Sequence, residues 1–139
     1  MPSYPEPARS LPQRGAYDVV IAGGGLAGAA AALAAARGGA KTMLVERASC
    51  LGGVATAGLC CSIYNCYYTS KKTLGTGGIA VEIADRIAAD EGYGQAWHAH
   101  MGHVIYDPER MKVLLETLVR GAGAEILYDT ALCGAMLDG

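Results

Sequence analysis

Three glycines near the N-terminus stand at a spacing that can bind a phosphate group. Gly23, Gly25 and Gly28 follow the pattern G-x-G-x-x-G, directly after a run of β-branched residues and directly before an alanine-rich segment. In such a turn the first glycine permits the tight bend, the second lets a diphosphate approach the backbone, and the third lets helix and strand pack closely. The free N–H groups of the helix's first turn, near Leu26 and Ala27, point at that diphosphate and carry the positive end of the helix dipole. The spacing therefore predicts a dinucleotide-binding site.

Glu46 supplies the second part of such a site. It ends the next apolar run, where a carboxylate can accept hydrogen bonds from an adenosine ribose and would repel a 2′-phosphate. The alternative is a tight glycine turn that binds nothing, but the strand, the helix and the acid together favour a dinucleotide. These residues leave open whether the dinucleotide carries a nicotinamide or a flavin.

The elements around the glycines predict a βαβ unit. Residues 17–22 are rich in Val and Ile, as expected for a strand covered on both faces. Residues 26–37 are almost all alanine and leucine, which are strong helix formers, and the two glycines that follow end the helix. Residues 41–46 give the second strand, and such a crossover is almost always right-handed.

Two further helices are expected after a long loop. Residues 48–78 lack periodicity and predict the loop, whereas residues 79–90 carry Ile at every fourth position and predict a helix. Asp107 and Pro108 are typical of a helix start, an N-cap acid followed by proline at the first helical position. The apolar residues after them fall on one helix face: Met111, Leu114, Leu115, Leu118 and Val119.

The C-terminal region predicts two more strands, over residues 124–128 and 132–137. The last dipeptide, Asp138-Gly139, is a strong hairpin signal with no strand after it. We therefore expect an α/β fold with a Rossmann-like parallel sheet and a terminal antiparallel hairpin or meander. The open edge leads us to expect an incomplete domain, whose sheet is completed by further chain or by a second subunit.

Composition narrows the class of protein. The 139 residues suit one domain, and the net charge of −2 indicates neither nucleic acid nor an anionic membrane surface as a partner. No run approaches the roughly 20 apolar residues of a membrane span. Residues 1–16 predict an extended lead-in without the pattern of a secretory signal, and the five cysteines lack the spacing of a disulfide framework. We expect reduced thiols and a cytoplasmic protein.

Three segments together resemble a known family. Residues 17–28, 40–47 and 51–59 are similar to the bacterial FAD-dependent oxidoreductases of the glutathione-reductase-like flavoprotein superfamily. The resemblance implies FAD as the cofactor and a division into a lead-in, residues 1–16, and the N-terminal portion of an FAD-binding domain, residues 17–139, without the substrate domain.

The resemblance also implies roles for particular residues. A glycine pair in the loop after the acid passes close to the cofactor, and that place is held here by Gly52, Gly53, Val54, Ala55 and Thr56. Glu46 would hold the ribose, Arg47 would lie beside the adenine end, and the backbone of Leu132 would meet the adenine ring.

The remaining candidate side chains, which are histidines, cysteines and tyrosines, are weaker evidence for a functional site. His98, His100 and His103 lack a partner at metal-ligand spacing, so we expect loop histidines and no metal site. A redox dithiol among Cys60, Cys61 and Cys66 lacks the C-x-x-C spacing of known redox pairs. Three loop tyrosines could line a pocket or cover the core, with core packing favoured: Tyr64, Tyr67 and Tyr68.

The sequence thus predicts the FAD-binding portion of a flavin-dependent oxidoreductase, which transfers hydride or electrons through FAD to or from an unknown small-molecule substrate. No catalytic residue is assigned, and we do not expect turnover by these residues alone. Two alternatives stay open, an NAD-binding dehydrogenase fragment and a non-catalytic subunit or interaction module derived from a flavoprotein.

Overall fold

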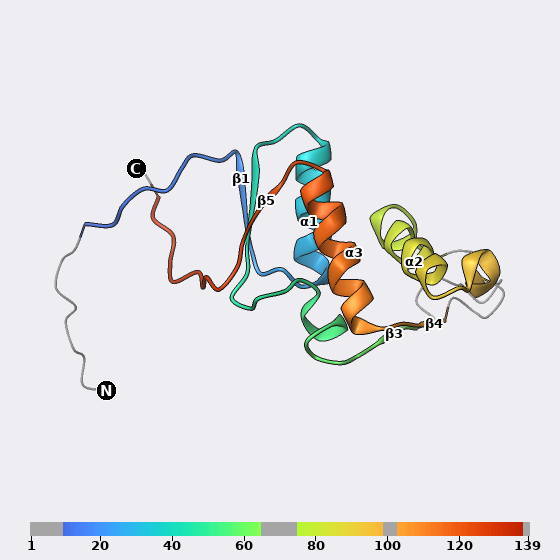
Figure 1. The fold of residues 1–139 in the computed structure, drawn as a ribbon. Helices are drawn as coiled ribbons and strands as arrows, with labels where there is room; N and C mark the ends of the chain where they lie inside the picture. The colour runs from blue at the N-terminus through green and yellow to red at the C-terminus, as the bar shows by residue number, and fades with distance from the viewer. Residues whose placement is uncertain (1–9, 65–74, 99–102, 138–139) are drawn as a thin grey trace.

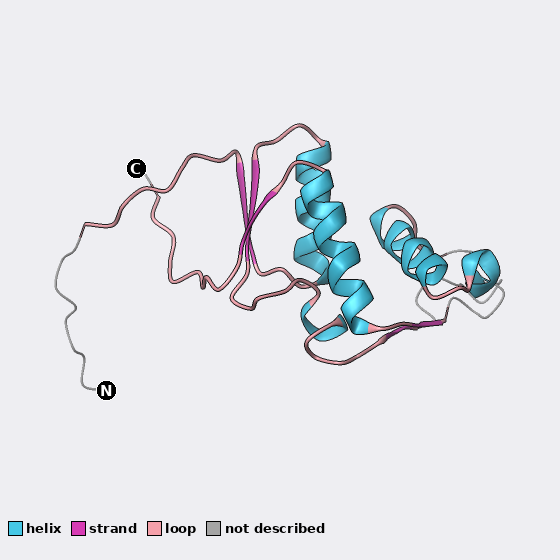
Figure 2. Cartoon of the chain, in the orientation of Figure 1, coloured by secondary structure: helices cyan, strands magenta, loops and turns pink. Residues whose placement is uncertain are grey.

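The computed structural model describes residues 10–64, 75–98 and 103–137 (Figure 1). A parallel sheet in the order β1-β2-β5 is formed by β1 (Val19–Ala22), β2 (Thr42–Val45) and β5 (Glu125–Leu127). The helices α1 (Leu26–Arg37) and α3 (Pro108–Gly121) lie together on one side of it (Figure 2). The helix α2 (Ile79–Asp90) lies beyond them, on the side away from the sheet. The α/β class and the parallel sheet are as predicted.

The sheet is covered by helices on one face. In register, Ile21 pairs with Leu44 and Leu44 with Ile126, and these three side chains pack into the core with Leu44 fully buried. The neighbouring residue Val20, which points to the other face, is 56% exposed. The expectation of a strand covered on both faces is therefore wrong for β1 within the described residues, because no helix of the described chain lies on that second face.

The two helices next to the sheet form where the sequence predicts them. In α1 the buried residues are mostly alanines, whose small side chains let the helix approach the sheet closely. The side chain of Asp107 accepts the N–H of Glu109 at 2.8 Å, and Pro108 opens α3. All five apolar residues expected on one face of α3 are buried.

An ion pair links α1 to α2. Arg37, the last residue of α1, donates to both carboxylate oxygens of Glu82 at 2.7 and 2.8 Å. These hydrogen bonds hold the pKa of Glu82 below its ordinary value. Three residues further along α2, Asp85 accepts the indole N–H of buried Trp97 at 2.8 Å. The helix α2 is thus joined by side-chain hydrogen bonds to both α1 and Trp97.

Short elements occupy the loops. The loop after β2 contains a 3₁₀ turn η1 (Gly53–Ala55) and the strand β3 (Ser62–Ile63), which pairs antiparallel with β4 (Val104–Ile105). A second 3₁₀ turn, η2 (Gly94–His98), follows α2. The antiparallel pair therefore lies in the middle of the chain and connects the long loop to the start of α3.

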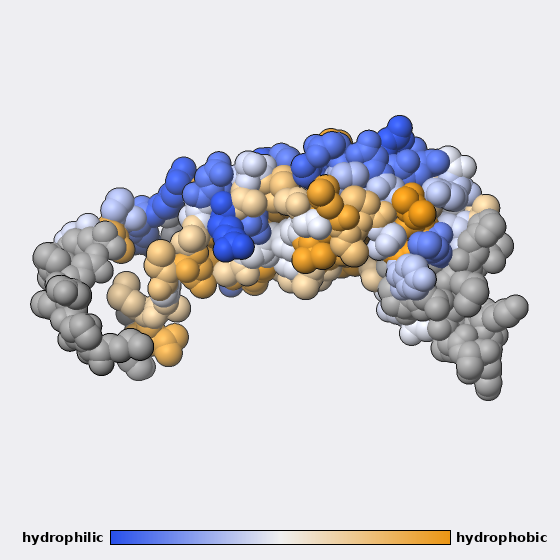
Figure 3. All heavy atoms as spheres, turned by 90° about the horizontal axis from the view of Figure 1, so that it is seen from below, coloured by the Kyte–Doolittle hydropathy of each residue, from blue (hydrophilic) through white to orange (hydrophobic). Residues whose placement is uncertain are grey.

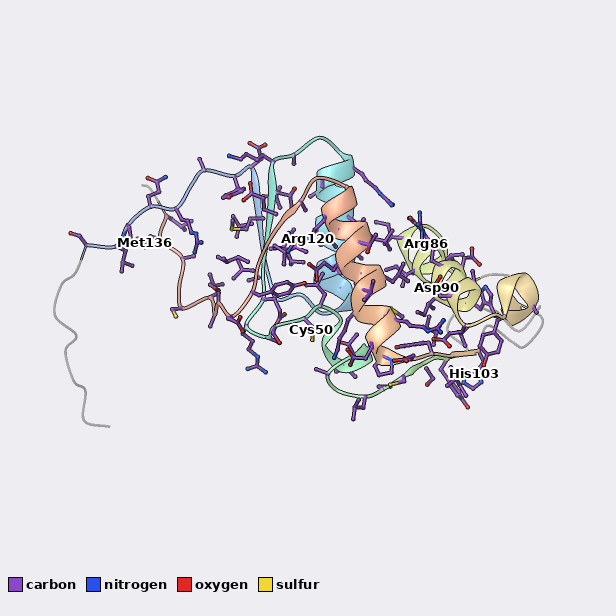
Figure 4. All side chains as sticks on the ribbon, in the orientation of Figure 1. Cys50, Arg86, Asp90, His103, Arg120 and Met136 are labelled. Atoms are coloured by element: carbon purple, nitrogen blue, oxygen red, sulfur yellow. The ribbon has the colours of Figure 1, made fainter. Side chains whose placement is uncertain are left out.

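The C-terminal segment departs from the prediction. The expected strand over residues 132–137 is not formed, and residues 131–137 have no regular structure. In Figure 4, Met136 lies on the far side of the sheet from α1 and α3, and it is 94% exposed. Because a strand needs a hydrogen-bonded partner and none of the described segments pairs with this one, its apolar residues alone do not make it a strand. Asp138-Gly139 lies outside the described residues.

The described part of the lead-in, residues 10–16, is exposed and has no regular structure. Tyr17 makes side-chain contacts with distant parts of the chain. Its hydroxyl donates to Glu125 at 2.8 Å, and its ring lies under the Lys41 ammonium. None of the helices in the described ranges is both long and apolar enough to span a membrane.

Candidate functional site

The first glycine turn has the backbone geometry that the spacing predicts. Gly23 has φ +98°, a backbone conformation that residues with a side chain rarely adopt. A Cβ atom at Gly28 would lie 1.8 Å from the carbonyl oxygen of Gly23, so only glycine lets α1 pack this closely on the turn. A Cβ at Gly25 would meet no atom within 4 Å. The space in front of Gly25 is therefore open, and any side chain there would project into it.

The amino end of α1 is bare. Its N-cap residue is Gly25, no side chain caps the helix, and no acidic residue lies in its first turn. The Ala29 N–H bonds to the Gly25 carbonyl at 2.9 Å, whereas the preceding N–H groups, including those of Leu26 and Ala27, have no acceptor within the helix by its geometry. Free N–H groups at the positive end of a helix suit a diphosphate.

The second glycine pair packs directly on the first. The Gly52 N–H donates to the Gly24 carbonyl at 2.8 Å, and Gly25 and Gly52 form a parallel bridge. Gly52 has φ +102°, and a Cβ there would lie 2.4 Å from Thr56. A Cβ at Gly53 would come within 3.4 Å of the Gly25 Cα. Two stretches without side chains thus flank the same opening, which fits the dinucleotide diphosphate expected there.

Glu46 is joined to both the turn and the loop that follows it. One carboxylate oxygen accepts the Gly24 N–H and the other accepts the Ala48 N–H at 2.7 Å. A carboxylate offers about four acceptor sites, so acceptor capacity remains for ribose hydroxyls. Gly24 was not predicted as a site residue, although a Cβ there would lie 2.6 Å from Leu51 and 3.1 Å from Glu46. The three consecutive glycines were the signal that could have identified it.

A cavity of about 500 Å³ opens at the amino end of α1. Six of the predicted cofactor residues line it: Gly25, Leu26, Ala27, Gly52, Val54 and Ala55. Ile63, Tyr64 and Tyr106 complete much of the remaining wall. The described lining contains no Asp, Glu, Lys, Arg or His, so the cavity beside the diphosphate position suits an uncharged, largely apolar group.

The surface around the cavity is also apolar in part. Figure 3 shows the molecule from below, with apolar residues gathered across the middle of this face and hydrophilic ones along its upper edge. Val54 and Leu59, in and just after η1, are 71% and 72% exposed. Val54 also lines the cavity, and exposed apolar side chains of this kind mark a surface that other groups can cover.

Thr56 has a contact within its own loop. Its side chain is fully buried, and its hydroxyl donates to the Leu51 carbonyl at 2.6 Å. It is not among the residues that line the cavity, so its visible contribution is to hold the loop that carries Gly52 and Gly53. A direct role of Thr56 in cofactor binding stays a prediction.

The two residues predicted for the adenine end do not line the cavity. Arg47 is exposed at the end of β2, and Leu132 is 63% exposed in the irregular C-terminal segment, outside the cavity. That segment does begin beside the site, because the Thr130 N–H donates to the Glu46 carbonyl at 3.0 Å. The roles of Arg47 and Leu132 stay predictions.

The described residues include only part of each of the weaker histidine, cysteine and tyrosine clusters. His103, just before β4 (Figure 4), makes an edge contact with Tyr64, with ring centroids 4.7 Å apart. Cys60 and Cys61 are free thiols, as are the other two cysteines that the structure describes. In those same ranges no three His, Cys, Asp or Glu side chains are placed to hold a metal ion. The side chain of His98 and four further residues are not described: Cys66, Tyr67, Tyr68 and His100.

The parallel sheet, the glycine turn and the acid at the end of β2 define an α/β dinucleotide-binding protein. Residues 18–139 match the family model of the FAD dependent oxidoreductases, and the chain belongs to that family. FAD is therefore the cofactor, and the prediction of the FAD-binding portion of a flavin oxidoreductase is confirmed. The alternative of an NAD-binding dehydrogenase fragment is not favoured by this match.

The chain is similar to the crystal structure of Thermovibrio ammonificans THI4, with 20% sequence identity and a TM-score of 0.49. The match covers 81% of this chain and 38% of that one, so this chain spans less than half the length of that neighbour. No curated protein matches the chain.

Proposed function

We propose that this chain holds FAD for an oxidoreductase, with the diphosphate at the amino end of α1 between Gly25 and the Gly52–Gly53 pair. One observation carries the proposal: the bare helix end opens between two glycine segments onto an uncharged cavity. When bound, FAD accepts or gives a hydride or electrons on its own ring system. The chain's part is to bind the diphosphate, orient the cofactor and keep water from one side of it.

The two ends of the site suit different halves of the cofactor. Glu46 would bind the adenosine ribose with the acceptor capacity that its two backbone contacts leave, and Arg47 and Leu132 would lie toward the adenine. The flavin half would extend from Gly25 into the cavity, against Val54 and Ala55, where no described side chain carries a charge. This orientation is supported by the contact of Glu46 with Gly24, because Glu46 is not among the residues that line the cavity beside Gly25.

The finer classification belongs to the same proposal. The three segments of resemblance support a place in the glutathione-reductase-like flavoproteins of bacteria, with residues 1–16 as a lead-in and residues 17–139 as the FAD-binding domain. Substrate-binding and catalytic residues, and the partner of the open edges of β1 and β5, would come from further chain or a second subunit. The free thiols support a reducing, cytoplasmic location.

A glycine substitution tests the proposal in the full-length protein. Gly25→Ala puts a methyl group into the open space before α1, so it leaves the free energy of unfolding within about 1 kcal/mol of wild type. The same methyl group occupies the diphosphate position, so we expect the Kd for FAD to rise at least about tenfold, a change of about 1.4 kcal/mol. FAD titration of apoprotein by flavin fluorescence measures it.

Gly121→Ala is the matched control, because a Cβ there also meets nothing within 4 Å but lies at the far end of α3. Gly121→Ala should change neither the FAD affinity nor the folded structure. An unchanged FAD affinity in Gly25→Ala, or a wild-type protein that binds no flavin, would contradict the proposal.

A further inference from the structure

Tyr106 reaches the cofactor site from a distant part of the chain. Its side chain is 4% exposed and forms part of the cavity wall. Its hydroxyl lies 3.2 Å from the carbonyl oxygen of Ala55 and 3.1 Å from that of Cys60. The phenol has one proton to donate, and the two carbonyl oxygens are both within its reach. A single hydroxyl thus joins two points that lie on either side of a turn.

The segment that Tyr106 joins is tightly folded. Within it the Cys60 N–H donates to the Val54 carbonyl at 3.0 Å, and the Gly58 N–H donates to the Gly53 carbonyl at 2.9 Å. Leu59 has φ +57°, a left-handed conformation that is unfavourable for a leucine. We call residues 53–60 the cofactor turn. A turn that includes an unfavourable residue keeps its shape only when its surroundings hold it.

Tyr106 itself is anchored on regular elements. Its backbone N–H donates to the Cys61 carbonyl at 3.1 Å, next to the β3–β4 pair. The following residue, Asp107, caps α3 with its side chain, and its own N–H donates to Glu91 at the end of α2 at 2.8 Å. The base of the tyrosine is therefore fixed by two helices and a strand pair, which suits a residue that has to hold another segment in place.

We propose that Tyr106 is a positioning residue of the FAD site, which holds the cofactor turn closed so that Val54 and Ala55 face the cofactor. The proposal rests on the proposed function, since these two residues matter only if the flavin half lies in the cavity. The alternative is that Tyr106 is a core tyrosine that contributes only to the stability of the fold. The two differ in what loss of the hydroxyl does to flavin binding.

Tyr106→Phe removes only the hydroxyl, and Tyr128→Phe is its matched control. The Tyr128 hydroxyl donates to Glu116 of α3 at 3.0 Å, outside the cavity lining. Burial, with the nearby Glu116 carboxylate, raises the pKa of Tyr128 to about 12, so this hydroxyl also remains a donor at neutral pH. Both variants lose one hydroxyl hydrogen bond and should lose similar stability.

Three measurements in the full-length protein separate the readings. In Tyr106→Phe we expect the Kd for FAD to rise about fivefold, and the visible absorption envelope of the bound flavin to change. We also expect faster hydrogen exchange of the apoprotein in the peptide that covers the cofactor turn. Tyr128→Phe should show none of these changes.

The outcomes are distinguishable from a failure of the proposed function. If Tyr106→Phe matches Tyr128→Phe in FAD affinity and flavin spectrum, the positioning role is overturned while flavin binding by the wild type stands. If exchange in the cofactor turn is unchanged, the hold on the turn itself is overturned. If the wild type binds no FAD, the proposed function fails and the positioning role fails with it.

Discussion

The hydrogen bonds of Glu46 give a prediction that needs no cofactor. In Glu46→Gln one carboxylate oxygen becomes an amide NH₂, so only one of the two backbone N–H groups, at Gly24 or Ala48, still meets an acceptor. A hydrogen bond to a charged group contributes about 1.5–3 kcal/mol to the stability of the fold. In Glu46→Gln, the backbone N–H that loses its acceptor also faces the amide NH₂, which is another donor. We expect the free energy of unfolding to fall by about 2 kcal/mol in Glu46→Gln and by about 4 kcal/mol in Glu46→Ala, which loses both bonds.

Urea and thermal unfolding of the apoprotein, followed by far-ultraviolet circular dichroism, measure these losses. A loss of about 2 kcal/mol corresponds to roughly 7 °C in Tm for a chain of this size. The urea midpoint should fall while the slope m stays constant, because the surface exposed on unfolding is unchanged. Glu109→Gln is the control, since that carboxylate is 71% exposed and belongs to a surface pair with Lys112.

The outcome decides what Glu46 does before any nucleotide binds. If Glu46 only bound the ribose and had no structural role, the Glu46→Gln apoprotein would be as stable as the Glu109→Gln apoprotein. Only the FAD affinity would then change in Glu46→Gln. Equal midpoints for the two glutamine variants would therefore refute the inference that Glu46 joins the glycine turn to the loop after β2.

Two further predictions concern the apoprotein. Gly28→Ala should lower the free energy of unfolding by about 3 kcal/mol, because its methyl carbon would lie 1.8 Å from the Gly23 carbonyl oxygen, and the turn or α1 would have to shift. Urea unfolding measures this loss. A loss no larger than that of Gly25→Ala would contradict the prediction. Arg37 lowers the pKa of Glu82, so their pair stabilises the fold above about pH 4.3 and the contribution is lost as pH falls through the folded-state pKa. Arg37→Gln should lower the urea midpoint at neutral pH and flatten its decrease in acid, and parallel pH profiles would count against the pair.

The parts of the fold that the sequence predicted are those with local causes. The start of α3 follows from Asp107 and Pro108 alone, and its buried face follows from a spacing within fourteen residues. The glycine turn is equally local, because its conformation is set by the missing side chains of Gly23 and Gly28. Such features need no knowledge of what packs against them.

Contacts between distant segments were not predictable in the same way. The strands β3 and β4 have two residues each, too few to show an alternating pattern, and their pairing joins residues about forty positions apart. Tyr106 stands next to the predicted helix cap, but nothing in its neighbours indicates that its hydroxyl reaches Ala55. The apolar segment at 132–137 gave the opposite error, because its composition suggested a strand that no described segment pairs with.

The site is held together by backbone contacts that exist before a cofactor is added. Gly24 donates its N–H to Glu46 and accepts the N–H of Gly52, so one residue links the acid, the first glycine turn and the second glycine pair. A site whose segments are already joined loses little conformational freedom on binding, and more of its contact energy then appears as affinity. Gly24, the middle of the three consecutive glycines, is thus explained by protein contacts, whereas the open space at Gly25 is explained by the ligand expected there. The substitutions at Glu46 and Gly25 test these two causes separately.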